Sequence, residues 1–365
     1  MRITFVIASL SAGGAERVVS TMANFWARRG WPVTILSFDD DKTPPFFELD
    51  TLVTYTPLGL LGESAGLLSG ICNNVRRVVR LRQSLAHTKP DAVISFGEKT
   101  NVTTLIATWG VPTPVIVSER TDPHRHSIGT IWTALRWCSY ARADRIVVQT
   151  AGASKYFLPK FRQTLTIIPN PVPAASEAQA GSSDYSARRR ILGVGRLSVE
   201  KGFENLLYAF AQVRTRYPDW SLVIVGEGPQ RPVLESLRER LGLSESVSLP
   251  GLEPTLWDCS NRVGLFVLCS HFEGFPNALC EAMARGIPVI ATDCPSGPRE
   301  IIDDGENGLL VPPGDVGALA DAMIALLSDP IRRARMGDCA RGITLRFGLE
   351  MVMRMWEDVL PPASN

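Results

Sequence analysis

Two glutamates lie on either side of the start of a predicted helix in the C-terminal half of the chain. Glu273 stands in the loop before the helix, and Glu281 stands five residues inside it. At about 1.5 Å per residue, this places Glu281 about 7.5 Å along the helix. Two carboxylates at that separation can hold two hydroxyl-bearing parts of one ligand. An ordinary surface position is the alternative for Glu281, but its neighbours are apolar, so we expect it to be buried with hydrogen-bond partners.

The start of the same helix is a predicted anion site. Proline suits the first helical position, because its missing N–H would be unpaired there in any case. With Pro276 at that position, the N–H groups of Asn277, Ala278 and Leu279 can meet an anion at the positive end of the helix. A phosphate group could then lie between the two carboxylates.

A second loop, Gly193–Gly202, places two cations beside flexible backbone. Arg196 and Lys201 stand five residues apart, directly after a predicted buried strand. The planar arginine grips a diphosphate with two hydrogen bonds, and lysine adds a compact charge. Both could instead be solvated surface residues. Two glycines resemble a dinucleotide fingerprint, but Ser198 replaces its third glycine, which argues against a dehydrogenase.

Two more glycine loops follow predicted strands. Gly13 and Gly14 separate the first strand from the first helix, where backbone N–H groups can approach an anion, although an ordinary tight turn explains them equally well. Gly226 and Glu227 begin a Gly-Glu-Gly-Pro loop at the same sheet edge as Arg196. A structural turn is the favoured interpretation there.

The elements that position these loops alternate between short apolar runs and stretches of helical periodicity, which predicts parallel sheets covered on both faces. The pattern stops at a small, polar, aperiodic segment and then restarts. We predict an N-terminal domain over 1–172, a linker over 173–187 and a C-terminal domain over 188–345, with 346–365 as a helix that packs back on the first domain. The fold class is therefore α/β, with two doubly wound domains that face each other across a cleft. Ligands are expected beyond the carboxyl ends of the strands.

The boundaries of the predicted elements are as follows. The strands are Ile3–Ala8, Val33–Ser37, Ala92–Ser95, Val115–Ser118 and Arg145–Val148, then Arg190–Val194, Ser221–Val225, Ser246–Leu249, Gly264–Leu268 and Pro288–Ala291. The helices are Ala15–Arg28, Val75–Leu85, Thr133–Ala141, Phe203–Tyr217, Arg231–Leu241, Pro276–Ala284 and Ala318–Leu327.

Composition excludes several classes of protein. A chain of 365 residues with 45% hydrophobic residues is not disordered, and a net charge of +1 gives no support to nucleic-acid binding. Residues 1–180 carry 19 Lys/Arg and 13 Asp/Glu, whereas residues 181–365 carry 19 and 24, so the first half is expected to contact phosphates or an anionic surface.

Seven cysteines without a C-x-x-C pair, and only four histidines, predict no metal site and reduced, cytosolic thiols. The opening apolar run is too short for a signal peptide, and prolines break the longest uncharged stretch, so no membrane span is expected.

One segment of the first domain is basic and amphipathic. Residues 66–83 contain four arginines and no acidic residue. On a helix, the arginines Arg76, Arg77 and Arg80 fall on a different face from the apolar residues, which are Ile71, Val75, Val78, Val79 and Leu85. Such a helix can lie on an anionic membrane, or it can pack on the core with its arginines in solvent. The sequence leaves both interpretations open.

These residues together resemble the family-4 retaining glycosyltransferases of GT-B fold, which have two Rossmann-like domains. The resemblance rests on an E-x(7)-E pattern with the glycine and cation motifs Gly195-Arg196-Leu197, Lys201-Gly202 and Gly226-Glu227-Gly228-Pro229. Further matching segments are 168–172, 286–292, 297–302 and 307–312. The resemblance covers nearly the whole chain, more strongly in the second domain. Residues 294–298 are similar to bacterial enzymes that extend lipid-linked glycans.

The resemblance implies a nucleotide-sugar donor in the second domain and a glycan acceptor in the first. Arg196 and Lys201 would neutralise the donor diphosphate, Glu281 would bind the ribose, and Glu273 with the backbone after Pro276 would address the sugar. Fixed cations stabilise the charge that develops on the departing diphosphate without a metal. We therefore expect no cofactor and no metal, with UDP-linked hexose or N-acetylhexosamine as the donor substrate.

The first domain departs from the family pattern. The loop of Gly13 and Gly14 would reach the phosphates, but many relatives carry a histidine at the end of a first-domain strand. Here Glu119 and Arg120 stand at that place, and the nearest histidines follow at 124 and 126. Glu119 and Arg120 are the candidate catalytic residues of this corner, without an assigned role.

The expected acceptor is a polyprenyl-diphosphate-linked glycan, and the expected location is cytoplasmic, peripheral on the inner face of the membrane. Two other classes share the two-domain fold. A UDP-sugar 2-epimerase needs no acceptor and lacks the E-x(7)-E pattern, and a non-catalytic nucleotide-sugar-binding protein would not need the retained cations and acids.

Overall fold

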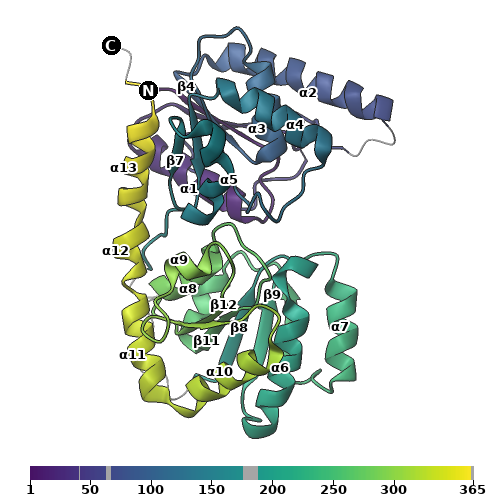
Figure 1. Cartoon of the computed structure of the whole chain (residues 1–365), viewed down its shortest axis with the longest axis vertical. Helices are drawn as coiled ribbons and strands as arrows, with labels where there is room; N and C mark the ends of the chain where they lie inside the picture. The colour runs from purple at the N-terminus through teal and green to yellow at the C-terminus, as the bar shows by residue number, and fades with distance from the viewer. Residues whose placement is uncertain (41, 63–66, 176–187, 363–365) are drawn as a thin grey trace. The chain divides into compact units, whose positions relative to one another are not determined.

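The computed structural model describes residues 1–40, 42–62, 67–175 and 188–362, and the chain divides into two units. Unit 1 comprises Met1–Pro169 and Val352–Asn365, and unit 2 comprises Asn170–Met351 (Figure 1). Most of the predicted linker, residues 176–187, lies outside the described residues.

Unit 1 is built on a seven-stranded parallel sheet in the order β3-β2-β1-β4-β5-β6-β7. The strands are β1 (Ile3–Ile7), β2 (Val33–Ser37), β3 (Val53–Pro57), β4 (Ala92–Phe96), β5 (Val115–Ser118), β6 (Arg145–Val148) and β7 (Leu165–Ile167). Ile3 pairs with Val33 on one side and with Ala92 on the other. Because the chain runs outward in both directions from β1 and β4, the switch point of this sheet lies between them.

Helices cover the sheet of unit 1, and the C-terminal helix is one of them. They are α1 (Gly14–Arg28), α2 (Leu67–Thr88), α3 (Glu98–Ala107), α4 (Thr130–Ser139), α5 (Ala151–Phe161) and the end of α13 (Leu349–Val359). Trp356 of α13 is fully buried and stacks on Phe96 with ring centroids 6.0 Å apart. Trp26 donates its indole N–H to Glu357 at 3.0 Å. The chain end is therefore part of the core of unit 1.

Unit 2 is built on a six-stranded parallel sheet in the order β10-β9-β8-β11-β12-β13, with its switch point between β8 and β11. The strands are β8 (Arg190–Val194), β9 (Ser221–Val225), β10 (Val247–Gly251), β11 (Val263–Leu268), β12 (Val289–Thr292) and β13 (Leu309–Val311). The helices are α6 (Phe203–Arg216), α7 (Arg231–Arg240), α8 (Asn277–Ala284), α9 (Pro298–Ile301), α10 (Val316–Ser328), α11 (Pro330–Ala340) and α12 (Ile343–Phe347).

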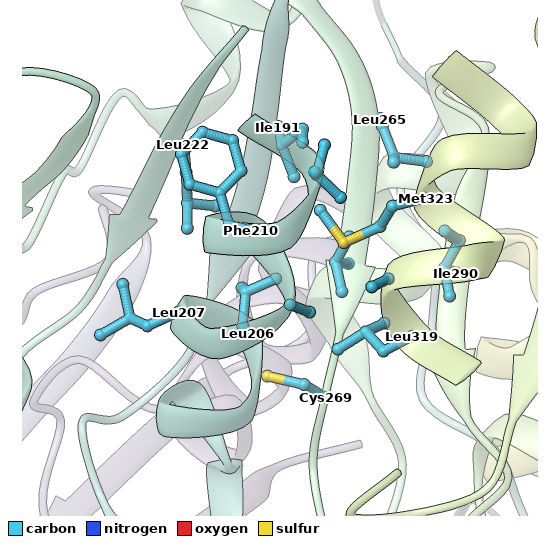
Figure 2. Packing of buried hydrophobic residues seen from close by; sticks show 14 of the residues in the cluster. Ile191, Leu206, Leu207, Phe210, Leu222, Leu265, Cys269, Ile290, Leu319 and Met323 are labelled. Atoms are coloured by element: carbon cyan, nitrogen blue, oxygen red, sulfur yellow. The ribbon is translucent and has the colours of Figure 1, made fainter. Parts of the chain in front are cut away.

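Two hydrophobic clusters cover the two faces of this sheet. On one face, Phe210 of α6 and Met323 of α10 pack over Ile191, Leu222 and Leu265 of the strands (Figure 2). The other cluster includes α8 and its neighbours. Burial on both faces explains why these strands read as continuous apolar runs, as predicted for a doubly wound sheet.

The sequence predictions missed elements whose side chains are polar or whose runs are short. The edge strand β3 contains Thr54, Tyr55 and Thr56, and β7 and β13 span only three residues each. Helix α3 lies within a threonine-rich stretch for which no helix was predicted. Threonine is a weak helix former, but the Thr104 hydroxyl donates to the carbonyl of Thr100 at 2.8 Å, inside the helix. Among the described residues, no helix combines the length and apolar character needed to cross a membrane.

Candidate functional site

The switch point of unit 2 brings together two of the predicted site residues. Lys201 ends a 3-10 turn, η2 (Val199–Lys201), after β8, and Glu273 follows β11. The Lys201 ammonium donates to the Glu273 carboxylate at 2.6 Å, and the Ser270 hydroxyl donates to the same oxygen at 2.6 Å. Glu273 is only 7% exposed, so its charge depends on these partners. Arg196 lies in the loop of Lys201 and is exposed.

A neighbouring loop fixes the backbone of Glu273. The Ser296 hydroxyl donates to the Glu273 carbonyl at 2.7 Å. Gly297 has a φ of +87°, and a Cβ there would lie 3.1 Å from Cδ of Pro276. The segment that resembles enzymes of lipid-linked glycans therefore packs directly on the Glu273 loop.

The Gly-Glu-Gly-Pro loop packs against the loop of Arg196. Gly226 has a φ of +148°, and a Cβ there would overlap the carbonyl oxygen of Gly195. Leu197 donates its N–H to the carbonyl of Glu227 at 2.9 Å. The Glu227 carboxylate pairs with Arg231 at 2.5 Å, and this hydrogen bond lowers the pKa of Glu227. These contacts are those of a structural turn.

Glu281 is buried and partnered, as predicted from its apolar neighbours. It is 5% exposed, and the Trp257 indole N–H donates to its carboxylate at 2.5 Å. Trp257 stands in η3 (Leu256–Arg262). The Arg285 guanidinium lies 4.5 Å from the centre of the Trp257 ring and donates to the Glu281 carbonyl at 2.9 Å. The two glutamates of the E-x(7)-E pattern thus have different partners, an ammonium and hydroxyl for Glu273 and an indole for Glu281.

The start of α8 differs from the prediction by one residue. Pro276 is not the first helical residue but precedes it, with a ψ of 86°. Its ring meets Gly297, and proline fixes only φ, so ψ can leave the helical region. Cys280 makes the first helical hydrogen bond, to the Pro276 carbonyl at 3.2 Å. Asn277, Ala278 and Leu279 form the first turn, and the Asn277 side chain accepts from Asn170 at 2.6 Å.

In unit 1, the predicted glycine loop packs against a carboxylate of its own helix. Gly13 precedes α1, and a Cβ there would overlap the carboxylate of Glu16. Ser9 donates to Glu16 at 3.3 Å, and burial raises the pKa of Glu16. The N-terminal end of α1, where Gly14 was predicted to meet a phosphate, therefore has a carboxyl side chain beside it.

Glu119, a candidate catalytic residue of the first domain, lies inside the protein. It is 1% exposed, its carboxylate accepts from the Tyr140 hydroxyl, and the Arg136 guanidinium lies 3.8 Å away. Burial raises the pKa of Glu119 to about 8. The backbone explains why Glu119 is buried. Its N–H continues the strand pairing to the Val147 carbonyl, so its side chain turns into the interior.

Arg120 is the partly exposed member of this pair. Its guanidinium lies 4.1 Å from the centre of the Phe96 ring, and burial lowers its pKa to about 9, opposed by the charge of Glu16. The loops after β1 and β5 are thus coupled electrostatically within unit 1. Glu98, which begins α3 after β4, accepts from the Thr121 hydroxyl next to Arg120.

Sequence reasoning missed four residues of these two regions: Glu16, Glu98, Trp257 and Ser270. Three had a usable signal, because Ser270 and Glu98 lie within three residues of the ends of predicted strands and Glu16 lies in the first turn of a helix. Trp257 had none, since its role depends on a tertiary contact. In the described part of the chain, no three His, Cys, Asp or Glu residues gather as metal ligands would.

Two family models adjoin along this sequence. Residues 12–176 match Glycosyltransferase Family 4, and residues 177–342 match Glycosyl transferases group 1. The chain belongs to the family-4 glycosyltransferases. Among solved structures, this glycosyltransferase is similar to HepE of Anabaena in complex with UDP-glucose, with a TM-score of 0.80 and 20% identity over 99% of both chains. It is also similar to sucrose-phosphate synthase from Thermosynechococcus elongatus, with a TM-score of 0.80 and 21% identity over 98% of both chains. The fold is GT-B.

Named relatives of the glycosyltransferase include enzymes of glycan assembly. One relative is an α-1,4-N-acetyl-D-galactosaminyltransferase of Campylobacter jejuni, which is 28% identical over all of this chain and 99% of the relative's length. Its full name includes the lipid-linked glycan GalNAc-α-(1→4)-GalNAc-α-(1→3)-diNAcBac-PP-undecaprenol. The amylovoran biosynthesis glycosyltransferase AmsD of Erwinia amylovora is 26% identical over 96% of both chains.

Proposed function

We propose that this glycosyltransferase moves a hexose or N-acetylhexosamine from a UDP-linked donor to a polyprenyl-diphosphate-linked glycan, with retention of the anomeric configuration and without a metal ion. The observation that carries the donor site is the Lys201–Glu273 pair at the switch point of unit 2. Ligands of doubly wound sheets bind at such points, beyond the carboxyl ends of the strands.

Two cations of unit 2, Lys201 and Arg196, would stabilise the negative charge of a leaving diphosphate. Lys201 is held close to Glu273, and the exposed Arg196 shares its loop, so both can bind the donor phosphates. As the bond to the sugar breaks, negative charge grows on the β-phosphate. Fixed cations and the first turn of α8, with Ala278 and Leu279, stabilise that charge more in the transition state than in the ground state.

The two glutamates then divide the rest of the donor between them. Glu281 accepts from the ribose hydroxyls, and Trp257 fixes the orientation of its carboxylate. Glu273 binds the hydroxyls of the sugar. Through its contact with Lys201 it also links sugar recognition to phosphate binding.

Unit 1 takes the acceptor. The loops after β1, β4 and β5 carry Gly13, Gly14, Glu98 and Arg120 at the switch-point end of its sheet. A lipid-linked acceptor is supported by the names of two Campylobacter jejuni relatives, one at 28% identity and a second, at 26%, that acts on a diphospho-undecaprenol-linked sugar. An acceptor of this kind places the enzyme at the anionic inner face of the membrane.

The test is a donor screen with and without a polyprenyl-diphosphate-sugar acceptor. We expect release of UDP that depends on the acceptor, a product whose new linkage is α by NMR, and full activity in EDTA. Arg196→Lys should lose most of this activity because the planar fork is lost. Wild-type turnover by that variant would refute the role of Arg196, and an epimerised UDP-sugar without acceptor would support the 2-epimerase instead.

A further inference from the structure

Helix α2 has a face that the rest of unit 1 leaves uncovered. Ile71, Val75 and Val79 are 61%, 57% and 47% exposed, whereas Leu81 and Leu85 of the same helix are buried in the core. The predicted apolar face is therefore divided between two environments, with Ile71 in solvent and Leu85 in the core. The three exposed residues recur at intervals of four, so they form one apolar stripe along the outside of unit 1, where α2 lies in Figure 1.

The arginines of α2 divide into two pairs. Arg77 donates to the Leu60 carbonyl at 3.1 Å, and Arg82 donates to the Ala107 and Trp109 carbonyls at 2.9 and 2.7 Å. Those two tie the helix to its unit. Arg76 and Arg80 instead are exposed and line a shallow hollow together with the apolar stripe.

Charge on this face has one sign. Residues 64–90 contain no aspartate or glutamate, so nothing on α2 neutralises Arg76 and Arg80 in place of an external anion. A protein surface that combines exposed valine and isoleucine with unopposed arginine fits a bilayer of anionic lipid, whose headgroups carry phosphates above an apolar layer.

An exposed aromatic residue adjoins the same helix. Trp109 is 65% exposed, and the bond from Arg82 to its carbonyl fixes it beside α2. The Arg142 guanidinium lies 4.2 Å from the centre of its ring. Tryptophan beside cations is typical of residues at a membrane–water boundary.

We propose that the outer face of α2, defined by Ile71, Val75, Arg76, Val79 and Arg80, docks on an anionic lipid bilayer. The helix lies parallel to the surface, its apolar stripe enters the headgroup boundary, and the two arginines meet lipid phosphates. This proposal rests on the proposed function only for the biological reason to bind a membrane, because a polyprenyl-linked acceptor is held there. The evidence for docking is the exposed apolar and basic surface of α2.

Flotation with vesicles tests the surface directly. Wild-type protein should bind vesicles of phosphatidylglycerol and phosphatidylcholine, bind pure phosphatidylcholine more weakly, and dissociate as salt rises. The double variant Arg76→Gln/Arg80→Gln should bind the anionic vesicles at least about tenfold more weakly. The triple variant Ile71→Ser/Val75→Ser/Val79→Ser should lose binding to both. The matched control Ile331→Ser/Arg332→Gln, at exposed positions of α11, should bind as wild type.

Cys72, exposed on the same face, gives an independent readout. An environment-sensitive fluorophore at Cys72, in a protein with Cys138→Ser and Cys339→Ser, should shift to shorter wavelength on anionic vesicles. The same label at Cys339 alone should not shift. Inorganic phosphate should not reproduce the shift, which separates a bilayer from a free anion.

Failure of this proposal can be distinguished from failure of the proposed function. All variants should keep wild-type turnover of a water-soluble, short-chain diphosphate acceptor, and loss of that turnover would point to the site rather than the surface. Wild-type protein that ignores anionic vesicles, or arginine variants that bind them as wild type does, would overturn the docking surface. Recovery on native membranes but not on pure lipid would assign the face to a membrane protein and would also overturn it.

Discussion

Lys201 and Glu273 are 72 residues apart in sequence, yet their ammonium and carboxylate lie 2.6 Å apart. Each follows a strand on one side of the switch point of unit 2, so the topology of the sheet brings them together. Their side chains are 22% and 8% exposed, which lets Lys201 reach a ligand while Glu273 stays largely enclosed. The pair therefore offers a positive charge that is fixed before any donor binds.

Removal of the ammonium should affect turnover more than folding. Lys201→Ala should lower kcat/KM by about 10²–10³-fold, because a cation aimed at the leaving diphosphate is lost. It should also lower the free energy of unfolding by about 1–3 kcal/mol, since the buried Glu273 carboxylate loses its cationic partner and keeps the Ser270 hydroxyl. Steady-state kinetics and urea unfolding measure the two effects. Turnover within about twofold of wild type would exclude Lys201 from the reaction.

The Trp257–Glu281 contact predicts a defect in nucleotide affinity. Trp257→Phe keeps an aromatic ring beside Arg285 but removes the N–H that orients the Glu281 carboxylate. We expect UDP to bind about tenfold more weakly by calorimetry, with a smaller change in kcat, because a ribose contact acts in ground and transition states alike. Trp220→Phe, in the hydrophobic cluster on the other face of the sheet, is the matched control and should leave UDP affinity unchanged. Equal affinities for all three proteins would contradict the ribose role.

The turn at Gly226 predicts a steric defect at the Arg196 loop. In Gly226→Ala the new methyl group meets the Gly195 carbonyl, so either the turn or the loop must move. Gly242 also has a positive φ, of +66° against +148° at Gly226, but there is open space around its Cβ, so Gly242→Ala is the control for backbone strain without a clash. Gly242→Ala should lose about 1 kcal/mol of stability from backbone strain alone, whereas Gly226→Ala should lose more and should also lose UDP binding and transferase activity. An active Gly226→Ala protein with normal stability would show that the two loops are not rigidly coupled.

Local sequence signals were sufficient for the strands that are buried on both faces, and for the loops that follow them. Val33–Ser37 and Ser221–Val225 were predicted with their observed boundaries, because a buried parallel strand is a continuous apolar run. The same signal is absent from the edge strand β3, whose Thr54 and Thr56 read as polar loop. Motif spacing in and after these loops also suggested Lys201, Glu273 and Glu281, but no local signal could show that Lys201 pairs with Glu273 or that Trp257 is the partner of Glu281.

The directions in which side chains point could not be predicted from the sequence. Glu119 and Arg120 are adjacent after β5, and only the strand register decides that Glu119 turns inward to Tyr140. Similarly, helical periodicity groups Ile71 with Leu85, but contacts with the rest of unit 1 bury only the second. Such assignments depend on which neighbouring element covers a face, which is a tertiary property.

The buried Glu119 predicts a pH-dependent stability. Burial raises its pKa in the folded protein to about 8, above the ordinary value of 4.5, so between these values the folded protein keeps a proton that the unfolded chain releases. The stability that this group contributes is fully present below pH 4.5 and declines as the pH rises toward 8, by about 1.4 kcal/mol per pH unit at most. Glu119→Gln resembles the protonated side chain and removes this dependence. In urea unfolding at pH 5.5, 6.5 and 7.5, the variant should gain stability relative to wild type by roughly 1–3 kcal/mol across the series. Glu48→Gln, at an exposed position of the same unit, controls for the loss of a carboxylate. A difference between Glu119→Gln and wild type that stays constant with pH would mean that Glu119 is ionised in the folded protein and paired with Arg136.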